Sequence, residues 1–158
     1  MARLIAADPE TLHEMVSRNE LIRFDSFIAP AVIRNYLSSI HFYCLQDDGS
    51  DEGIDLDLLK TYECEQFIHR DYTELANTPT PDPLVLDLCL DLFNNSDMYY
   101  EGDLWSQEKI DNFLDAFESS IRRAVLVTIS LSFAYSGTED NTRELARHVV
   151  PRILSKRK

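Results

Sequence analysis

The sequence predicts an all-α fold, in which residues 1–158 form a single domain of five or six helices around a long central helix. Glycine is scarce, with four in 158 residues, whereas hairpins and sandwiches use glycine heavily at their turns. Apolar residues also recur at spacings of three and four in several segments, as on the buried face of a helix. A chain of this length fits one domain and can bury about 70% of the surface that its unfolded form exposes.

The first predicted helix begins at Asp8 and Pro9 and ends near Asn19. Asp8 can cap its amino end, and Pro9 suits a first helical turn. A second helix is predicted to begin around Pro30. Its apolar stripe consists of Val32, Ile33, Tyr36, Leu37 and Ile40, followed by Tyr43 or Cys44.

An acidic, turn-rich segment, residues 47–53, is predicted to be a mobile linker because it has no hydrophobic anchor. Residues 54–77 are then interpreted as one helix. Three prolines make residues 78–83 a clear break and the best boundary between two halves of the chain. A helix is predicted to restart there and to carry residues 84–93, with Asp87 and Asp91 one turn apart on its solvent side.

Ser106 is a suitable cap for a long helix that reaches toward Gly137. Residues 125–135 complicate this interpretation, because apolar β-branched and aromatic residues alternate there with smaller ones, which is typical of a strand. Helix is preferred because no turn separates this segment from the preceding stripe and a solitary strand would leave its ladder groups unpaired. The alternative is an α+β fold with one or two strands within residues 84–92 and 125–135.

A last helix is predicted for residues 141–154, with Asn141 and Glu144 as a capping pair. Pro151 is expected to kink or end this helix. The remaining residues, 155–158, form a basic tail that is expected to fray.

Charge is distributed unevenly along the chain. Residues 47–118 contain 20 Asp and Glu but only three Lys and Arg, a net charge of −17, whereas residues 1–46 carry −1 and residues 119–158 carry +5. Such a field repels nucleic acid and anionic membranes and speeds encounters with basic partners. We therefore expect a basic protein partner, no direct nucleic-acid binding and no membrane binding.

The cysteines and the apolar segments predict a soluble cytoplasmic protein, with the nucleus left open by the basic tail. Three isolated cysteines without short spacings favour a reducing compartment. The apolar run at the amino end is too short for a signal peptide. The longest apolar stretch, residues 124–135, is interrupted by hydroxyl residues and falls short of the roughly 20 residues that a membrane span needs.

No motif predicts a metal, a cofactor or a catalytic residue. An EF-hand register that begins at Asp48 fails because Leu59 occupies the position of the bidentate glutamate. Neither a nucleophile elbow nor a glycine-rich phosphate loop is present. The zinc candidates lack paired short spacings; they are Cys44, Cys64, Cys89, His13, His41, His69 and His148.

Two charged rows leave alternatives open. Asp111, Asp115 and Glu118 form a like-charged helical row, which serves either solubility or a binding role. The basic carboxyl-terminal residues are expected to pair with the acidic middle of the same chain or of a second copy, which would make a homodimer. These residues are Arg143, Arg147, Arg152, Lys156, Arg157 and Lys158.

The candidate binding site is an aromatic segment bracketed by acids, a composition typical of interface hot spots. The alternative is a loop whose aromatic side chains fold back onto the core. The predicted site residues are Asp97, Tyr99, Tyr100, Glu101, Asp103 and Trp105, and an acidic steering group at residues 47–57 includes Asp51, Glu52, Asp55 and Asp57.

These features favour a non-enzymatic binding protein that masks a basic partner, such as an immunity protein, an antitoxin or an inhibitor that mimics nucleic acid. One alternative is a helical adaptor or host-factor antagonist that takes an amphipathic helix in an apolar groove. Another is a hydrolase with a carboxylate site, for which the paired carboxylates along the chain are the only support.

Overall fold

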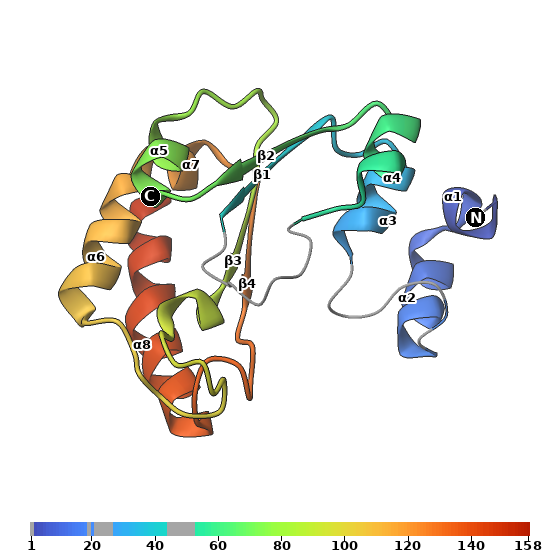
Figure 1. The fold of residues 1–158 in the computed structure, drawn as a ribbon. Coiled ribbons are helices and arrows are strands. Elements are labelled where there is room, and N and C mark those ends of the chain that lie inside the picture. Colours follow the sequence, from blue (N-terminus) through green and yellow to red (C-terminus); the bar gives the residue numbers. More distant parts are fainter. Residues whose placement is uncertain (1, 19, 21–26, 44–52) are drawn as a thin grey trace. The chain divides into compact units, whose positions relative to one another are not determined.

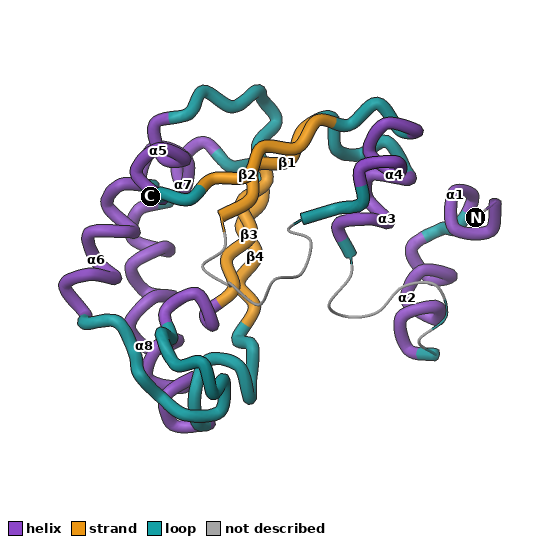
Figure 2. The backbone as a smooth tube through the Cα atoms, in the orientation of Figure 1, coloured by secondary structure: helices purple, strands orange, loops and turns teal. Residues whose placement is uncertain are grey.

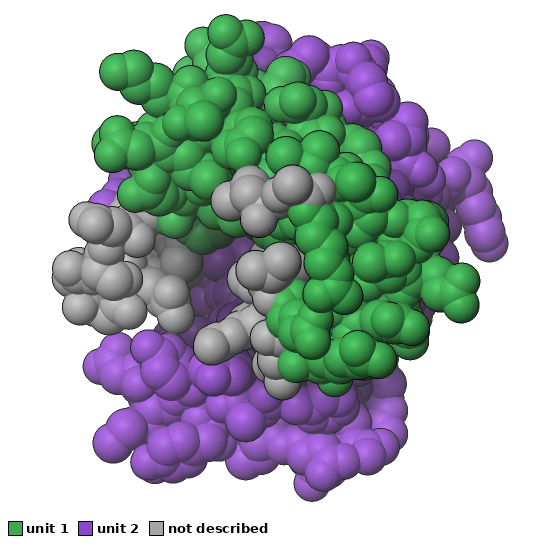
Figure 3. All heavy atoms as spheres, turned by 90° about the vertical axis from the view of Figure 1, so that its right-hand side faces the viewer, with its two compact units in different colours: residues 1–69 green, residues 70–158 purple. Residues whose placement is uncertain are grey.

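The computed structural model describes residues 2–18, 20, 27–43 and 53–158 (Figure 1). Contacts within the chain divide it into two compact units, unit 1 with residues 1–69 and unit 2 with residues 70–158 (Figure 3). The all-α prediction is wrong. The described residues form a mixed fold in which four strands make two separate two-stranded parallel sheets beside several helices.

Unit 1 contains four helices and one parallel strand pair within its described residues. The first predicted helix is confirmed, because α2 begins at Pro9 and the Asp8 carboxylate accepts a hydrogen bond of 2.8 Å from the Thr11 amide. The elements are α1 (Ala2–Ala6), α2 (Pro9–Ser17), α3 (Ile28–Ile33), β1 (Ser39–Tyr43), α4 (Leu56–Thr61) and β2 (Glu65–His69).

Left-handed residues end two of these helices earlier than the sequence predicts. Asn35 has a φ of 55° and follows α3, so the chain turns into β1 instead of continuing as helix. Glu63 has a φ of 53° and separates α4 from β2 within the segment that was predicted as a single helix. Turns of this kind usually use glycine, so the scarcity of glycine wrongly suggested that turns were rare.

Unit 2 combines a parallel strand pair with a layer of helices. Its elements are α5 (Tyr72–Asn77), β3 (Val85–Cys89), the 3₁₀ helix η1 (Leu90–Phe93), α6 (Gln107–Ala116), α7 (Glu118–Arg123), β4 (Leu126–Ser130) and α8 (Glu139–Lys156). Helices α6 and α8 lie along the same side of β3 and β4 (Figure 2). The residues buried in this unit include Leu88, Phe93, Ile110, Phe113, Leu114, Ile121, Leu145, Val149 and Ile153.

The two strands of unit 2 lie inside the ranges that the α+β alternative named. Strand β4 runs parallel to β3, with Val85 opposite Leu126 and Cys89 opposite Ser130. A strand within residues 125–135 was expected to leave its backbone groups unpaired, but β4 has a partner. The partner strand, β3, lies 41 residues earlier in the chain, where the sequence suggested a helix. Side chains alternate across β3, with Leu88 buried and Val85 and Cys89 exposed on the opposite face.

Helix capping explains the remaining boundaries. Ser106 caps α6 as predicted and accepts a hydrogen bond of 3.2 Å from the Lys109 amide. The long helix toward Gly137 is wrong, because α7 ends at Arg123 and the chain becomes extended. Helix α8 is capped by Thr138 and Asn141 in place of the predicted pair, and it continues through Pro151 to Lys156.

Candidate functional site

Two neighbouring loops of unit 2 expose a cluster of large apolar side chains that we call the aromatic patch. One loop, residues 94–105, follows η1, and the other, residues 131–138, joins β4 to α8 (Figure 1). The loops are directly linked, because the Gly137 amide donates a hydrogen bond of 2.9 Å to the Tyr99 carbonyl. The patch consists of Met98, Tyr99, Tyr100, Leu131, Phe133 and Tyr135, whose exposed fractions range from 38% to 59%.

The side chain of Asn94 holds both loops in place. Its Nδ2 group lies 3.2 Å from the Tyr99 carbonyl, 3.1 Å from the Glu101 carbonyl and 3.2 Å from the Tyr135 carbonyl. Its Oδ1 atom accepts a hydrogen bond of 2.9 Å from the Asp103 amide. The side chain of Asn94 therefore bonds to three backbone groups of the first loop and to one of the second loop.

A buried hydroxyl group fixes the second loop. Ser136 is fully buried, and its Oγ atom lies 2.9 Å from the Leu131 carbonyl and 2.7 Å from the hydroxyl of Thr142, which is also fully buried. The same loop holds Ser132 and Ala134 in left-handed conformations, with φ values of 49° and 69°. Such conformations cost about 1–2 kcal/mol each in residues other than glycine, so the surrounding contacts must impose this backbone shape.

Trp105 lies in the core and does not contribute to the surface of the patch. Only 4% of the residue is exposed, and its ring packs edge-on against Phe93 at 5.4 Å between centroids. Its Nε1 atom donates a hydrogen bond of 2.8 Å to the Asn95 side chain. The Lys109 Nζ atom lies over the ring of Trp105, 3.5 Å from its centroid. Trp105 therefore anchors the first loop, as the alternative of aromatic side chains folded onto the core anticipated for this residue.

The acids predicted beside the aromatic residues are exposed and unneutralised. Asp97, Glu101 and Asp103 are all exposed, and they form no ion pair with any residue in the described parts of the chain. The remaining predicted acids belong to unit 1. Asp55 caps α4 through the Leu58 amide at 2.8 Å and Asp57 is exposed, whereas Asp51 and Glu52 lie outside the described residues.

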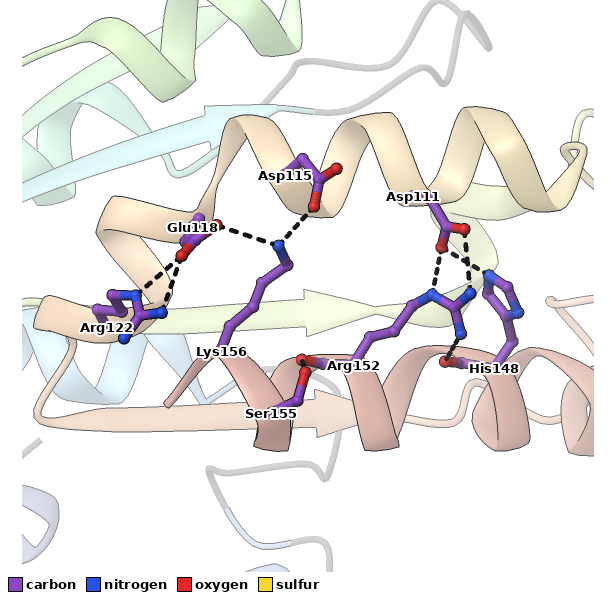
Figure 4. Close-up of polar contacts among 8 residues, drawn as sticks. All are labelled: Asp111, Asp115, Glu118, Arg122, His148, Arg152, Ser155 and Lys156. Carbon is purple, nitrogen blue, oxygen red and sulfur yellow. Dashed lines mark hydrogen bonds and ion pairs between the residues drawn. The ribbon is translucent and has the colours of Figure 1, made fainter. Parts of the chain in front are cut away.

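The predicted acidic row of α6 and α7 is neutralised by α8. Asp111 contacts Arg152 and His148, and Lys156 bonds to Asp115 and Glu118 (Figure 4). The expected pairing of the basic end with the acidic middle therefore occurs within one chain at Arg152 and Lys156.

The pKa values of this row reflect these contacts. Partial burial alone would raise the pKa of Asp111, but hydrogen bonds from Arg152 and His148 hold it below its usual value. Hydrogen bonds from Arg122 and Lys156 lower the pKa of Glu118. The row is thus engaged in holding the helices together, in contrast to the acids beside the aromatic patch.

An open depression lies at one side of the aromatic patch. Its volume is about 550 Å³, and it is lined by Tyr100, Phe133, Ala134, Gly137, Thr138 and Glu139. Its walls are largely apolar, while Glu139 supplies a carboxylate at the amino end of α8.

A second polar cluster lies at the carboxyl ends of β3 and β4. Burial raises the pKa of Asp91, which also bonds to the Ser132 hydroxyl. Although Cys89 as a whole is exposed, its surroundings partly desolvate the thiol, and this desolvation, followed by the charges of Asp91 and Asp87, raises the pKa of the thiol to about 11. Since the thiolate is the reactive form, Cys89 is a poor nucleophile near neutral pH.

Of the zinc candidates, the structure brings His41 and His69 together across β1 and β2. The His41 Nδ1 and His69 Nε2 atoms lie 3.1 Å apart, and burial together with the charge of His69 lowers the pKa of His41. No group of three or more His, Cys, Asp or Glu side chains in the described parts of the chain could hold a metal ion. The calcium-loop register that the sequence already argued against spans residues 48–59, of which residues 48–52 lie outside the described residues.

Comparison with known proteins leaves the function to be argued from this geometry. No protein-family model matches the chain, and no curated protein or solved structure is significantly similar to it. Within the described residues, no helix has both the length and the apolar character needed to cross a membrane.

Half of the aromatic patch was missed in the sequence because Leu131, Phe133 and Tyr135 were assigned to a helix. The strand-like alternation of residues 125–135 was the available signal, since it argued against a helix here, although the strand ends at Ser130 and residues 131–135 form part of the loop. Asn94 had no comparable signal, because its role depends on carbonyl groups that only the folded loops bring together.

Proposed function

We propose that this protein is a non-enzymatic binding protein whose aromatic patch and adjacent acids mask a basic partner protein, as an immunity protein, an antitoxin or a nucleic-acid-mimicking inhibitor would. One observation carries the proposal: two mutually fixed loops expose six large apolar side chains beside carboxylates that have no cationic partner among the described residues.

The chemistry of the patch suits a cationic protein surface. Tyrosine supplies a large, rigid contact area and is enriched among the residues that dominate binding energy. Aromatic faces attract Lys and Arg side chains, and exposed carboxylates accelerate encounter with a positive partner. The fixed backbone also reduces the conformational entropy that is lost when a partner binds.

Charge reversal tests the proposal. We expect the triple variant Asp97→Lys, Glu101→Lys and Asp103→Lys to lose the basic proteins that the wild-type chain captures from its native lysate at about 50 mM NaCl and releases at about 300 mM. The matched control, Glu10→Lys, Glu14→Lys and Glu144→Lys, makes the same change in net charge outside the patch and should retain them. Unchanged capture by the patch variant, with unchanged salt dependence, would refute the proposal.

A second candidate function, a hydrolase with a carboxylate site, is favoured by one specific observation. Asp91 has a raised pKa and lies at the carboxyl ends of parallel strands, where open α/β sheets commonly place ligands. Hydrolysis of any ester, amide or glycoside probe by the wild-type chain, abolished by Asp91→Asn, would establish this function. Turnover that survives Asp91→Asn would exclude a role for this carboxylate.

A further inference from the structure

The depression beside the aromatic patch has the form of a receptor for a single protruding side chain. Its volume of about 550 Å³ lies within the range of small-molecule pockets, roughly 300–1,000 Å³, but those pockets enclose most of their ligand, whereas this one is open. An open depression on an interaction surface suits a group that enters while attached to a partner.

Its lining combines two aromatic rings with one carboxylate. Tyr100 and Phe133 are 59% and 50% exposed, so their rings are accessible to an incoming group. Glu139 lies at the same depression. A planar cation can stack on aromatic faces and donate two parallel hydrogen bonds to a carboxylate, and arginine is the side chain that does both.

Glu139 already binds one guanidinium group, but through only one of its two carboxylate oxygens. Arg143, one helical turn along α8, donates to Glu139 from two of its nitrogens, and both contacts go to the Oε1 atom. None of the described residues donates a hydrogen bond to Oε2. An incoming cation could therefore bind Oε2 and compete with Arg143 for the carboxylate.

One residue that lines the depression, Gly137, is held in a conformation and a close contact that require glycine. Gly137 has a φ of 87°, and a Cβ atom there would lie 2.9 Å from the Asn141 Oδ1 atom and 3.0 Å from the Gly102 Cα atom. Asn141 in turn completes the capping box of α8 with Thr138. The shape of the depression is thus tied to the start of a long helix and does not depend on the partner.

We propose that this depression receives an arginine side chain of the basic partner, with the guanidinium group against Tyr100 and Phe133 and hydrogen-bonded to Glu139. The inference rests on the proposed function and adds a preference for arginine over lysine. Lysine carries the same charge, but it lacks the planar group that stacks and forms two parallel hydrogen bonds.

The test compares two peptides of equal length and charge on the full chain. One is a glycine–serine decapeptide with four arginines, and the other has four lysines at the same positions. Isothermal titration at about 50 mM NaCl should show the arginine peptide binding about five-fold more tightly, because only the guanidinium group can stack flat on the rings and form two parallel hydrogen bonds with the carboxylate. Tyr100→Ala and Phe133→Ala should each remove this preference, while Phe27→Ala, which truncates an exposed ring of unit 1, should retain it.

Two further variants separate recognition from structural support. Glu139→Gln should weaken arginine binding, whereas Arg143→Gln should strengthen it because the carboxylate loses its internal competitor. If the ion pair between Glu139 and Arg143 only supported the structure, both substitutions would change the affinity for the arginine peptide in the same direction. The fluorescence of buried Trp105 should keep its wild-type emission maximum in every variant and thereby report an intact loop.

The outcomes for the two proposals are distinct. Equal affinity for both peptides, with both lost on charge reversal of Asp97, Glu101 and Asp103, would overturn the arginine site and leave the proposed function standing. No salt-sensitive binding of either peptide would overturn both.

Discussion

Asn94 is a single polar side chain that joins the two loops of the aromatic patch. Replacing it with alanine removes the donor for the Tyr99, Glu101 and Tyr135 carbonyls and the acceptor for the Asp103 amide. These bonds are exposed to solvent, so water can partly replace the lost partners and the expected net cost is about 1 kcal/mol.

We therefore expect Asn94→Ala to lower the free energy of unfolding by about that amount, measured by urea denaturation. Asn77→Ala is the matched control, because Asn77 makes one exposed hydrogen bond of 2.7 Å to the Thr73 carbonyl within its own helix. Equal effects of the two substitutions would show that the loops do not depend on Asn94.

At the scale of secondary-structure elements, the ion pairs between α6, α7 and α8 make stability depend on pH. The pKa values of Asp111 and Glu118 are lowered in the folded state, so these carboxylates favour folding above their unfolded pKa values. This contribution is lost as the pH falls from the ordinary pKa values, 3.8 for Asp111 and 4.5 for Glu118, through the lowered folded values.

We expect Asp111→Asn to be less stable than the wild type at pH 7 and the difference to disappear near pH 2, measured as urea midpoints over this range. Asp97→Asn is the control, since Asp97 has no ion pair in the described parts of the chain, and it should match the wild type throughout. A difference between Asp111→Asn and wild type that persists at pH 2 would assign the effect to packing and not to charge.

Local signals in the sequence were sufficient for some elements and not for others. Asp8 and Ser106 predicted the starts of α2 and α6 because capping is a matter of a few adjacent residues. The strands were mostly missed because each is defined by a partner far away in the chain. The candidate site was predicted only in part for the same reason: Tyr99 and Tyr100 were identified, but the adjacent Phe133 belongs to a segment that was interpreted as helix.

At the scale of the whole chain, negative charge exceeds positive charge in both units. Unit 1 has 13 acidic and five basic residues, and unit 2 has 15 acidic and 10 basic residues. Like charges in a compact chain repel one another, and salt screens this repulsion over a length that falls from about 30 Å at 0.01 M to about 10 Å at 0.1 M.

We expect the midpoint of thermal unfolding to rise by about 2–5 °C between these salt concentrations, measured by circular dichroism. The variant Glu10→Lys, Glu14→Lys and Glu144→Lys is six charge units less negative and should show a smaller rise. A midpoint that falls with added salt would mean that the attraction between α8 and its acidic partners outweighs the general repulsion.

Both sheets are parallel pairs, and this feature bears on the order in which the chain folds. Partner residues are 26 positions apart in the first pair and 41 in the second, so neither pair can form by closing a short hairpin. Closing such long loops slows folding. Until a strand has paired, its backbone edge is exposed and can associate with another chain. Strands β2 and β3 lie in the most acidic part of the sequence, and repulsion between like charges opposes such association.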